Sequence, residues 1–442
     1  MVTFEQRWLE QMAYYPASPR PRLRNTLALA ASPAVIVFLS SNFVNVGNLV
    51  FNMIFSRLMG PELFGTLAIL LTIKLALLGV TGAFQMAVSQ MVASCTGDER
   101  PTVEQALSRI NRFLFLGVLT LGTLLTTGLV LGGTVGARLS PTEPHLLAFL
   151  LAAIPFGASL SVLRGVAFGD IRTSRIVLSA NAEMGVRLIG ALLAWALGFG
   201  IEGVVVAISV SIIASWAVLY DLLPAIKPNG QTVSYSKAMG LATIPFAILQ
   251  LTQVMALDGD IFIAKSLLSE QETGFVAALS LFQRIQFFAC FALAGVLLPR
   301  VILAARTGED VVQSAMPVFL LFAGVSLVVL SATLLAPETL VVILVGDAYI
   351  PAATALLAAV SAAMFFTFNY LVTTFLVALK DRNGVVMIAA GACIQFGAMA
   401  ASESAGFADL IFIKAICQAG TAFGLALCAI SHLRRTSRAS CL

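Results

Sequence analysis

Five basic residues lie inside long apolar stretches, where charged side chains are uncommon: Lys74, Arg164, Arg187, Arg284 and Lys414. At the centre of a bilayer each would cost about 2.5–3.5 kcal/mol on the insertion scale. If all five faced lipid, the cost would be on the order of 12–17 kcal/mol, comparable to the whole stability of a domain. We therefore expect these side chains to face a cavity or a partner, where they would bind anions.

Two of these cations occupy nearly equivalent places in the two halves of the chain. Lys74 follows Gly65 by nine residues, and Arg284 follows Gly274 by ten. Neither has an acid at helical spacing within its own apolar stretch. Because a buried phosphate needs charge-assisted donors, one cation from each half would suit a diphosphate in a shared cavity.

The other three cations have structural alternatives. Arg187 is one helical turn from Glu183, so an internal ion pair is an open interpretation. Arg164 and Lys414 lie nearer the ends of their stretches, from which a long side chain can reach the headgroups. We keep Arg164 and Arg187 as cavity candidates beside Lys74 and Arg284.

Polar residues recur at helical spacing around these cations and form three stripes: Lys74, Thr81, Gln85 and Ser89; Ser179, Glu183 and Arg187; Asn42, Asn45, Asn48 and Asn52. Each set falls on one helical face. Hydrogen bonds between helices, worth about 0.6 kcal/mol per contact, are the alternative explanation. Taken together the stripes favour a wet central cavity, to which Gln85, Asn45 and Asn48 would belong.

Acidic residues suggest ion coupling. Asp258 and Asp260 are predicted to end an apolar stretch, and Asp260 shares a helical face with Gln250 and Gln253. A carboxylate there would bind H+ or Na+, or would simply be the solvated end of a helix. Glu183 is the third candidate for coupling.

The remaining chemistry is sparse. The chain has two histidines and six cysteines without paired spacing, so we predict no metal site and no disulfide framework. It has no phosphate-binding loop, no dinucleotide turn and no hydrolytic triad, and we expect neither a cofactor nor an enzymatic activity. Its net charge of +4 is dispersed, which excludes a nucleic-acid partner.

Composition identifies the elements that hold these residues. Of 442 residues 59% are hydrophobic and 11% are charged, against about 25% charged in a soluble domain. A span needs about 20 apolar residues. The predicted class is an all-α polytopic membrane protein of about twelve helices, near 34–56, 63–85, 113–135, 146–168, 175–198, 203–225, 239–259, 273–299, 314–335, 352–378, 384–403 and 408–430.

The distribution of basic residues predicts the orientation. With the N-terminus in the cytoplasm, most of the 26 Lys and Arg residues fall in cytoplasmic segments, as the positive-inside rule requires. An even number of spans then places both termini in the cytoplasm. The first 25 residues are polar and do not resemble a cleavable signal.

A weak repeat divides the chain. Residues 58–68 and 267–277 share Leu, Gly and Ala at a constant offset, and Gly169-Asp170-Ile171-Arg172 is echoed by Lys380-Asp381-Arg382-Asn383. Both halves begin on the cytoplasmic side, so the repeats would be parallel, with a site between them. The predicted divisions are a basic tail at 1–25, two six-helix lobes at 26–228 and 229–433, and a cytoplasmic tail at 434–442.

Several motifs carry a family resemblance. Asn42 to Asn48, followed by Phe55-Ser56-Arg57-Leu58-Met59-Gly60-Pro61-Glu62-Leu63-Phe64-Gly65, resembles the first helix and LGPxxFG turn of polysaccharide exporters. These are O-antigen-type flippases of the MOP (multidrug/oligosaccharidyl-lipid/polysaccharide) superfamily. Further similar segments are Asp258-Gly259-Asp260, residues 272–278, Leu297-Leu298-Pro299-Arg300 and Val345-Gly346-Asp347-Ala348-Tyr349.

The resemblance implies two six-helix bundles around a central cavity in a bacterial inner membrane. It implies alternating-access export of an undecaprenyl-diphosphate-linked oligosaccharide, driven by an ion gradient or the membrane potential. The implied partners are the lipid-linked sugar, membrane lipid, a coupling ion such as H+ or Na+, and a polysaccharide polymerase or glycosyltransferases.

Two alternatives stay open at this point. A MATE-like antiporter of drugs or metabolites would share the architecture, but cationic drugs need an acidic cavity and the spans hold more bases than acids. A membrane sugar polymerase or ligase would place its chemistry on a sizeable loop, and the predicted loops are short.

Overall fold

A computed structural model describes residues 33–95, 100–131, 143–224, 233–379, 381–402 and 406–439. Every regular element within these ranges is helical, as the composition predicts. The basic tail at 1–25, Lys380 and the last three residues lie outside them.

Eleven helices in the described ranges are long and apolar enough to cross a membrane. One of them, the 55-residue stretch Leu39–Ala93 within α3 (Pro33–Ser94), is more than twice the length of about 20 residues that a bilayer requires. Counting it as two crossings reproduces the predicted twelve. The protein is therefore a multi-pass membrane protein.

The two crossings of α3 meet at a kink. Gly60 has φ 69° and ψ 176°, a conformation outside the helical region, and Pro61 follows it. Glycine adopts a positive φ without steric cost, and proline cannot donate to the preceding turn. The Gly60-Pro61 pair thus bends the chain where the sequence predicts a turn between the first two spans.

The chain forms two compact units that are interleaved along the sequence. Unit 1 contains residues up to Asn48, Thr81–Leu124 and Leu151–Ile244, and unit 2 contains Leu49–Val80, Leu125–Leu150 and Pro245–Leu442. The lobe boundary at 228/229 remains a prediction.

Unit 1 is built from the ends of α3 together with most of α4 (Arg100–Leu131), most of α6 (Pro144–Gly169), α7 (Thr173–Ala196), α8 (Gly200–Ala217) and η2 (Tyr220–Leu222). Lipid and apolar side chains are equally hydrophobic, so helices associate here through close packing. Gly165 and Gly169 of α6, four residues apart, receive Val88 and Val92 of α3, and a Cβ on either glycine would come within 2.8 Å of a valine.

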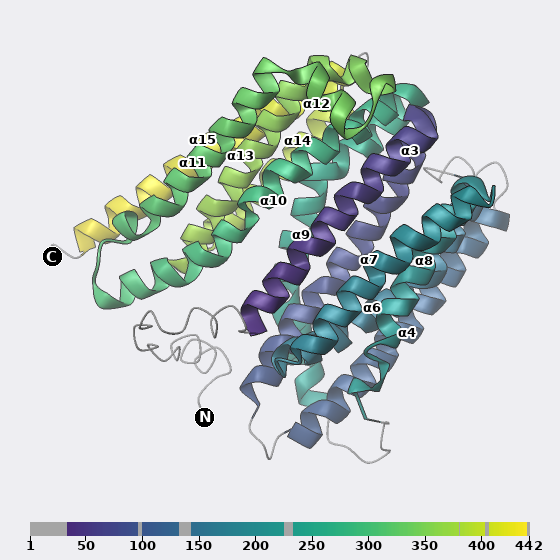
Figure 1. Cartoon of the computed structure of the whole chain (residues 1–442). Helices are drawn as coiled ribbons and strands as arrows, with labels where there is room; N and C mark the ends of the chain where they lie inside the picture. The colour runs from purple at the N-terminus through teal and green to yellow at the C-terminus, as the bar shows by residue number, and fades with distance from the viewer. Residues whose placement is uncertain are drawn as a thin grey trace, which may run out of the picture. The chain divides into compact units, whose positions relative to one another are not determined.

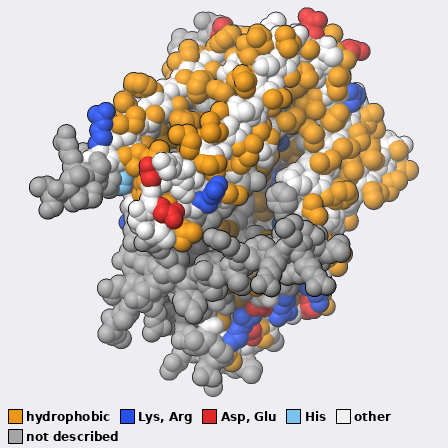
Figure 2. Space-filling view, turned by 60° about the vertical axis from the view of Figure 1, so that its left-hand side comes forward, with side chains coloured by type: hydrophobic (Ala, Val, Ile, Leu, Met, Phe, Trp, Pro, Cys, Tyr) orange, Lys and Arg blue, Asp and Glu red, His pale blue; other side chains and the backbone are white. Residues whose placement is uncertain are grey.

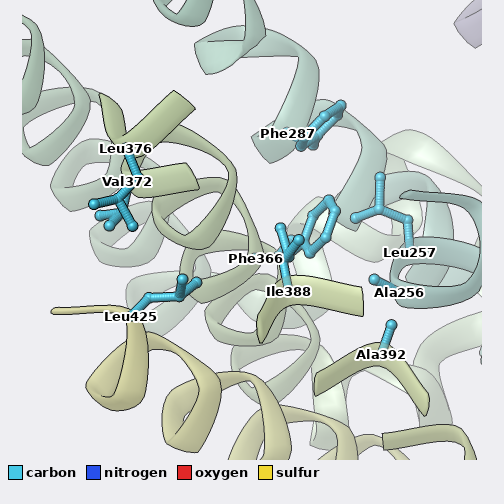
Figure 3. Close-up of a cluster of buried hydrophobic side chains, with 10 residues drawn as sticks. Ala256, Leu257, Phe287, Phe366, Val372, Leu376, Ile388, Ala392 and Leu425 are labelled. Atoms are coloured by element: carbon cyan, nitrogen blue, oxygen red, sulfur yellow. The ribbon is translucent and has the colours of Figure 1, made fainter. Parts of the chain in front are cut away.

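Unit 2 holds the middle of α3 and the helices α9 (Val233–Leu267), α10 (Glu270–Thr307), α11 (Val311–Leu335), α12 (Pro337–Leu344), η3 (Asp347–Ala352), α13 (Ala353–Ala378), α14 (Asn383–Ala400) and α15 (Phe407–Ala439). Helices α10, α11, α13 and α15 run side by side (Figure 1). Figure 3 shows the core, where Phe287 packs on Phe366 with ring centroids 5.5 Å apart and Leu257 lies beside them.

Local signals delimit α10. Ser269 caps its N-terminus in a capping box with Glu272, and Gly308, at φ 74°, ends it. Asp310 then caps α11 by accepting hydrogen bonds from the backbone of Val312 and Gln313.

Two glycines that the sequence analysis aligned are in contact in the structure. Gly65 and Gly274, which correspond in the two repeats, lie against each other within unit 2. A Cβ on Gly65 would be 3.1 Å from the backbone nitrogen of Gly274, and a Cβ on Gly274 would be 2.1 Å from the carbonyl oxygen of Pro61. Glycine is required because the two backbones touch.

Among the described residues on the face drawn in Figure 2, hydrophobic side chains predominate and charged side chains form a few small groups. Exposed apolar residues are numerous on α4 and α11, where Phe113, Leu124, Leu320 and Leu335 are more than half exposed. Such a surface suits hydrocarbon.

Three helices extend beyond the spans predicted for them. Helix α9 continues to Leu267, beyond the predicted end at 259; α15 continues to Ala439, beyond the predicted end at 430; and α4 begins at Arg100, before the predicted start at 113. The first error arose because the two aspartates were interpreted as a helix end. Both are buried by partners from other helices, so charge does not end the span.

Candidate functional site

Unit 1 contains a polar cluster around Arg164 of α6. Its Nη2 donates to Glu183 Oε2 of α7 at 3.0 Å and to Ser215 Oγ of α8 at 2.9 Å. Its Nε donates to Ser179 Oγ at 3.4 Å, and Ser179 and Ser215 share a hydrogen bond of 2.8 Å. The cation thus joins three helices. Glu183, which the sequence places beside Arg187, is the ion-pair partner of Arg164.

Arg187, one turn along α7 from Glu183, is buried and donates a hydrogen bond from Nη2 to Asn48 Oδ1 of α3. The structure therefore brings together four of the predicted site residues in unit 1, in the pairs Arg164–Glu183 and Arg187–Asn48. Of the other candidates on this part of α3, Asn45 is exposed and Gln85 is half-buried.

Unit 2 contains a second polar cluster around two carboxylates of α9. Asp258 and Asp260 lie nine and seven residues before the end of the helix at Leu267, and both are almost fully buried. They point to different neighbours, and each neutralises a predicted intramembrane cation.

The pair of Asp258 with Arg284 of α10 is partly open. Arg284 Nε and Nη2 both lie 2.9 Å from Asp258 Oδ1. The arginine side chain is 20% exposed, whereas the aspartate side chain is 2% exposed. Arg284 has no acid on its own helix, as the sequence shows, but tertiary structure supplies one from α9.

The pair of Asp260 with Lys414 of α15 is sealed, with 0% and 1% of the side chains exposed. Lys414 Nζ donates to Asp260 Oδ2 at 2.7 Å, to the carbonyl oxygen of Leu257 at 2.8 Å, and to Gln283 Oε1. Burial of this kind requires that every proton of the ammonium find an acceptor, and three acceptors surround it. The sequence allows Lys414 to reach the lipid headgroups, but in the structure its side chain points into the protein.

An amide network extends this cluster and was not recognised from sequence. Gln418 donates to Gln395 Oε1, Asn369 Nδ2 donates to Gln418 Oε1 at 3.0 Å, and Gln395 Nε2 donates to the carbonyl oxygen of Ala256 at 3.4 Å. One signal was present, because Gln418 follows Lys414 by four residues and shares its helical face.

Lys74 of α3 is buried and belongs to unit 2. Its role in a cavity shared with Arg284, and the cavity itself, remain predictions. Among the described residues there is no group of three His, Cys, Asp or Glu side chains that could hold a metal ion.

A scan against models of protein families finds no match, and a search of curated proteins finds none. Solved structures match over most of the chain. An inward-facing multidrug resistance MATE family transporter of the MOP superfamily has a TM-score of 0.71 at 16% identity, covering 89% of this chain and 96% of its own. The lipid II flippase MurJ has a TM-score of 0.71 at 12% identity, covering 89% and 87%.

The chain has the same fold as these two solved structures.

A third structure with this transporter fold comes from Pyrococcus furiosus, with a TM-score of 0.57 at 14% identity over 90% of this chain and 94% of its own. It is described as having a binding pocket of reverse polarity that suggests a different function. Drug transporters and a lipid flippase thus share the fold, and what this chain does must be argued from its own residues.

Proposed function

We propose that this transporter is a flippase that moves an undecaprenyl-diphosphate-linked oligosaccharide across the bacterial inner membrane by alternating access. The polar head would cross inside the protein while the lipid tail stays in the bilayer. An ion gradient or the membrane potential would drive the cycle, and both termini would be cytoplasmic.

The observation that supports an anionic substrate is the excess of positive charge inside the membrane. The sequence places five bases in the spans, and three acids, Glu183, Asp258 and Asp260, lie among them in the described helices. Glu183, Asp258 and Asp260 pair with three of the five bases. Lys74, which is buried in unit 2, is the base that we assign to the diphosphate of the substrate, because an ammonium is a charge-assisted donor to phosphate.

Efflux of cationic drugs is the second candidate function. It is favoured by the two mid-helix carboxylates, which the sequence alone had placed at a helix end, and by the equal similarity to a MATE transporter. The charge balance still favours the flippase, because each carboxylate is already neutralised by a base.

The experiment that separates these functions uses the purified protein in proteoliposomes. We expect movement of an undecaprenyl-diphosphate sugar between leaflets and no accumulation of a cationic dye. Lys74→Gln should abolish the lipid movement, whereas Arg175→Gln should not, because Arg175 pairs with Asp221 at an exposed site. Dye transport without lipid movement would establish the antiporter and refute the flippase. Sugar-chain growth by the purified protein would instead establish an enzyme.

A further inference from the structure

The two ion pairs of α9 differ in one respect that matters for function. The side chains of Asp260 and Lys414 are 0% and 1% exposed, so no ligand reaches either charge without unpacking the helices. The guanidinium of Arg284 is 20% exposed beside a carboxylate that is 2% exposed. A ligand can therefore reach Arg284 while Asp258 remains behind it.

The geometry of this open pair leaves room for a second anion. Arg284 contacts a single carboxylate oxygen, Oδ1, through Nε and Nη2. A guanidinium carries five N–H donors and is suited to bidentate binding of phosphate as well as carboxylate. A phosphate would therefore compete with Asp258 for the same cation.

We propose that Asp258 is a built-in counter-ion, which neutralises Arg284 when no substrate is bound and is displaced from it by a phosphate group of the substrate, with uptake of a proton by Asp258. The inference rests on the proposed function, since it takes the substrate to carry phosphate. The inference assigns the ion-coupling role to Asp258 and a structural role to Asp260. The sequence pattern favours the opposite assignment, because Asp260 is the aspartate that shares a helical face with Gln250 and Gln253.

The charges around Asp258 explain why it takes up a proton when the substrate binds. Arg284 faces it from α10, Asp260 lies two residues along its own helix, and Lys414 faces that neighbour from α15; Gln395 of α14, which packs on α9, is neutral. Once Arg284 binds phosphate, Asp258 would be a buried carboxylate without a counter-charge, close to a second carboxylate. An isolated buried charge is neutralised rather than retained, so the carboxylate accepts a proton from solvent.

The test measures binding of inorganic diphosphate to the purified full-length protein by isothermal titration calorimetry. Asp258→Asn removes the competing charge, and we expect it to bind diphosphate about tenfold or more tightly than the wild type, the equivalent of about 1.4 kcal/mol. Asp221→Asn is the control, because it removes the same charge from an exposed pair with Arg175, outside the cluster, and should give no gain. Arg284→Gln should lose binding.

The same titration counts protons when it is repeated in buffers of different ionisation enthalpy. The wild type should take up about one proton more per diphosphate than Asp258→Asn. Subtracting the two cancels the protonation of diphosphate itself, which is common to both proteins.

The outcomes separate the two proposals. Equal affinity in the wild type and Asp258→Asn, with loss in Arg284→Gln, would overturn the counter-ion and leave an anion-binding flippase intact. Equal proton uptake would overturn the coupling role. Unchanged binding in Arg284→Gln, or none in any variant, would overturn the inference entirely, and lipid movement in proteoliposomes would then decide the proposed function independently.

Discussion

The sealed pair of Lys414 and Asp260 allows a quantitative test of the structure. Replacing Lys414 with Met keeps an unbranched side chain of similar length but removes the ammonium. The change strands Asp260 Oδ2, Gln283 Oε1 and the carbonyl oxygen of Leu257, which are its three acceptors. Removing one partner of a buried pair costs about 3–5 kcal/mol, because the remaining charge has no compensation.

The exposed fractions decide how this loss compares with that at the open pair. Solvent reaches neither Lys414 nor Asp260, at 1% and 0%, so the full cost applies. Arg284 is 20% exposed, so water can partly solvate what Arg284→Gln leaves behind. For that variant we expect a smaller loss of about 1–3 kcal/mol.

The assay is the free energy of unfolding of purified protein in mixed micelles, followed by circular dichroism during titration with SDS. The double variant Asp260→Leu/Lys414→Met is the control, since replacing a whole buried ion pair with apolar side chains is often neutral. It should recover most of the loss of the single variant. A Lys414→Met protein as stable as the wild type, to within about 0.5 kcal/mol, would refute the sealed pair, and so would a double variant less stable than either single one.

Three further predictions concern other parts of the molecule. Gly274→Ala places a Cβ 2.1 Å from the Pro61 oxygen, whereas an ordinary contact is at least 3.4 Å. The two backbones must therefore move apart by about 1.3 Å. We expect the free energy of unfolding to fall by about 1–3 kcal/mol in the same SDS titration. Gly65→Ala, whose nearest contact is 3.1 Å, should lose less, and the reverse order would contradict the packing. Arg164→Lys should lower stability despite keeping its charge, because a single ammonium cannot replace both Nη2, which donates to Glu183 and Ser215, and Nε, which donates to Ser179. A stability equal to that of the wild type would show that the second nitrogen contributes nothing. A reporter fused after Leu442 should be active only if it works in the cytoplasm, and activity of a periplasmic reporter there would reverse the predicted topology.

Hydrophobic runs of the sequence were sufficient to predict the helices. Most predicted spans coincide with a helix to within a few residues, because a bilayer requires about 20 apolar residues in one continuous segment. The turn at Gly60-Pro61 was also predictable, since its residue types have few other uses inside an apolar stretch. The exceptions are the start of α4, where a polar first part of the helix precedes the apolar run, and the end of α9, where two aspartates interrupt the pattern that a hydropathy argument follows.

The pairing of charges could not be predicted in the same way. Sequence spacing shows only neighbours on the same helix, and on that basis Glu183 was the candidate partner of Arg187 while Arg284 had none. Tertiary packing pairs Glu183 with Arg164, Asp258 with Arg284 and Asp260 with Lys414, each across two helices, while Glu183 also attracts Arg187 on its own helix.

The sequence by itself determined that this protein is an all-helical membrane protein with too many charges in its spans to face lipid, because both properties depend on composition along one segment. The tertiary structure decided which charges are sealed and which remain open to a ligand. That distinction depends on which helices become neighbours. Asp260 and Lys414, for example, are 154 residues apart in the sequence and meet only when the chain has folded.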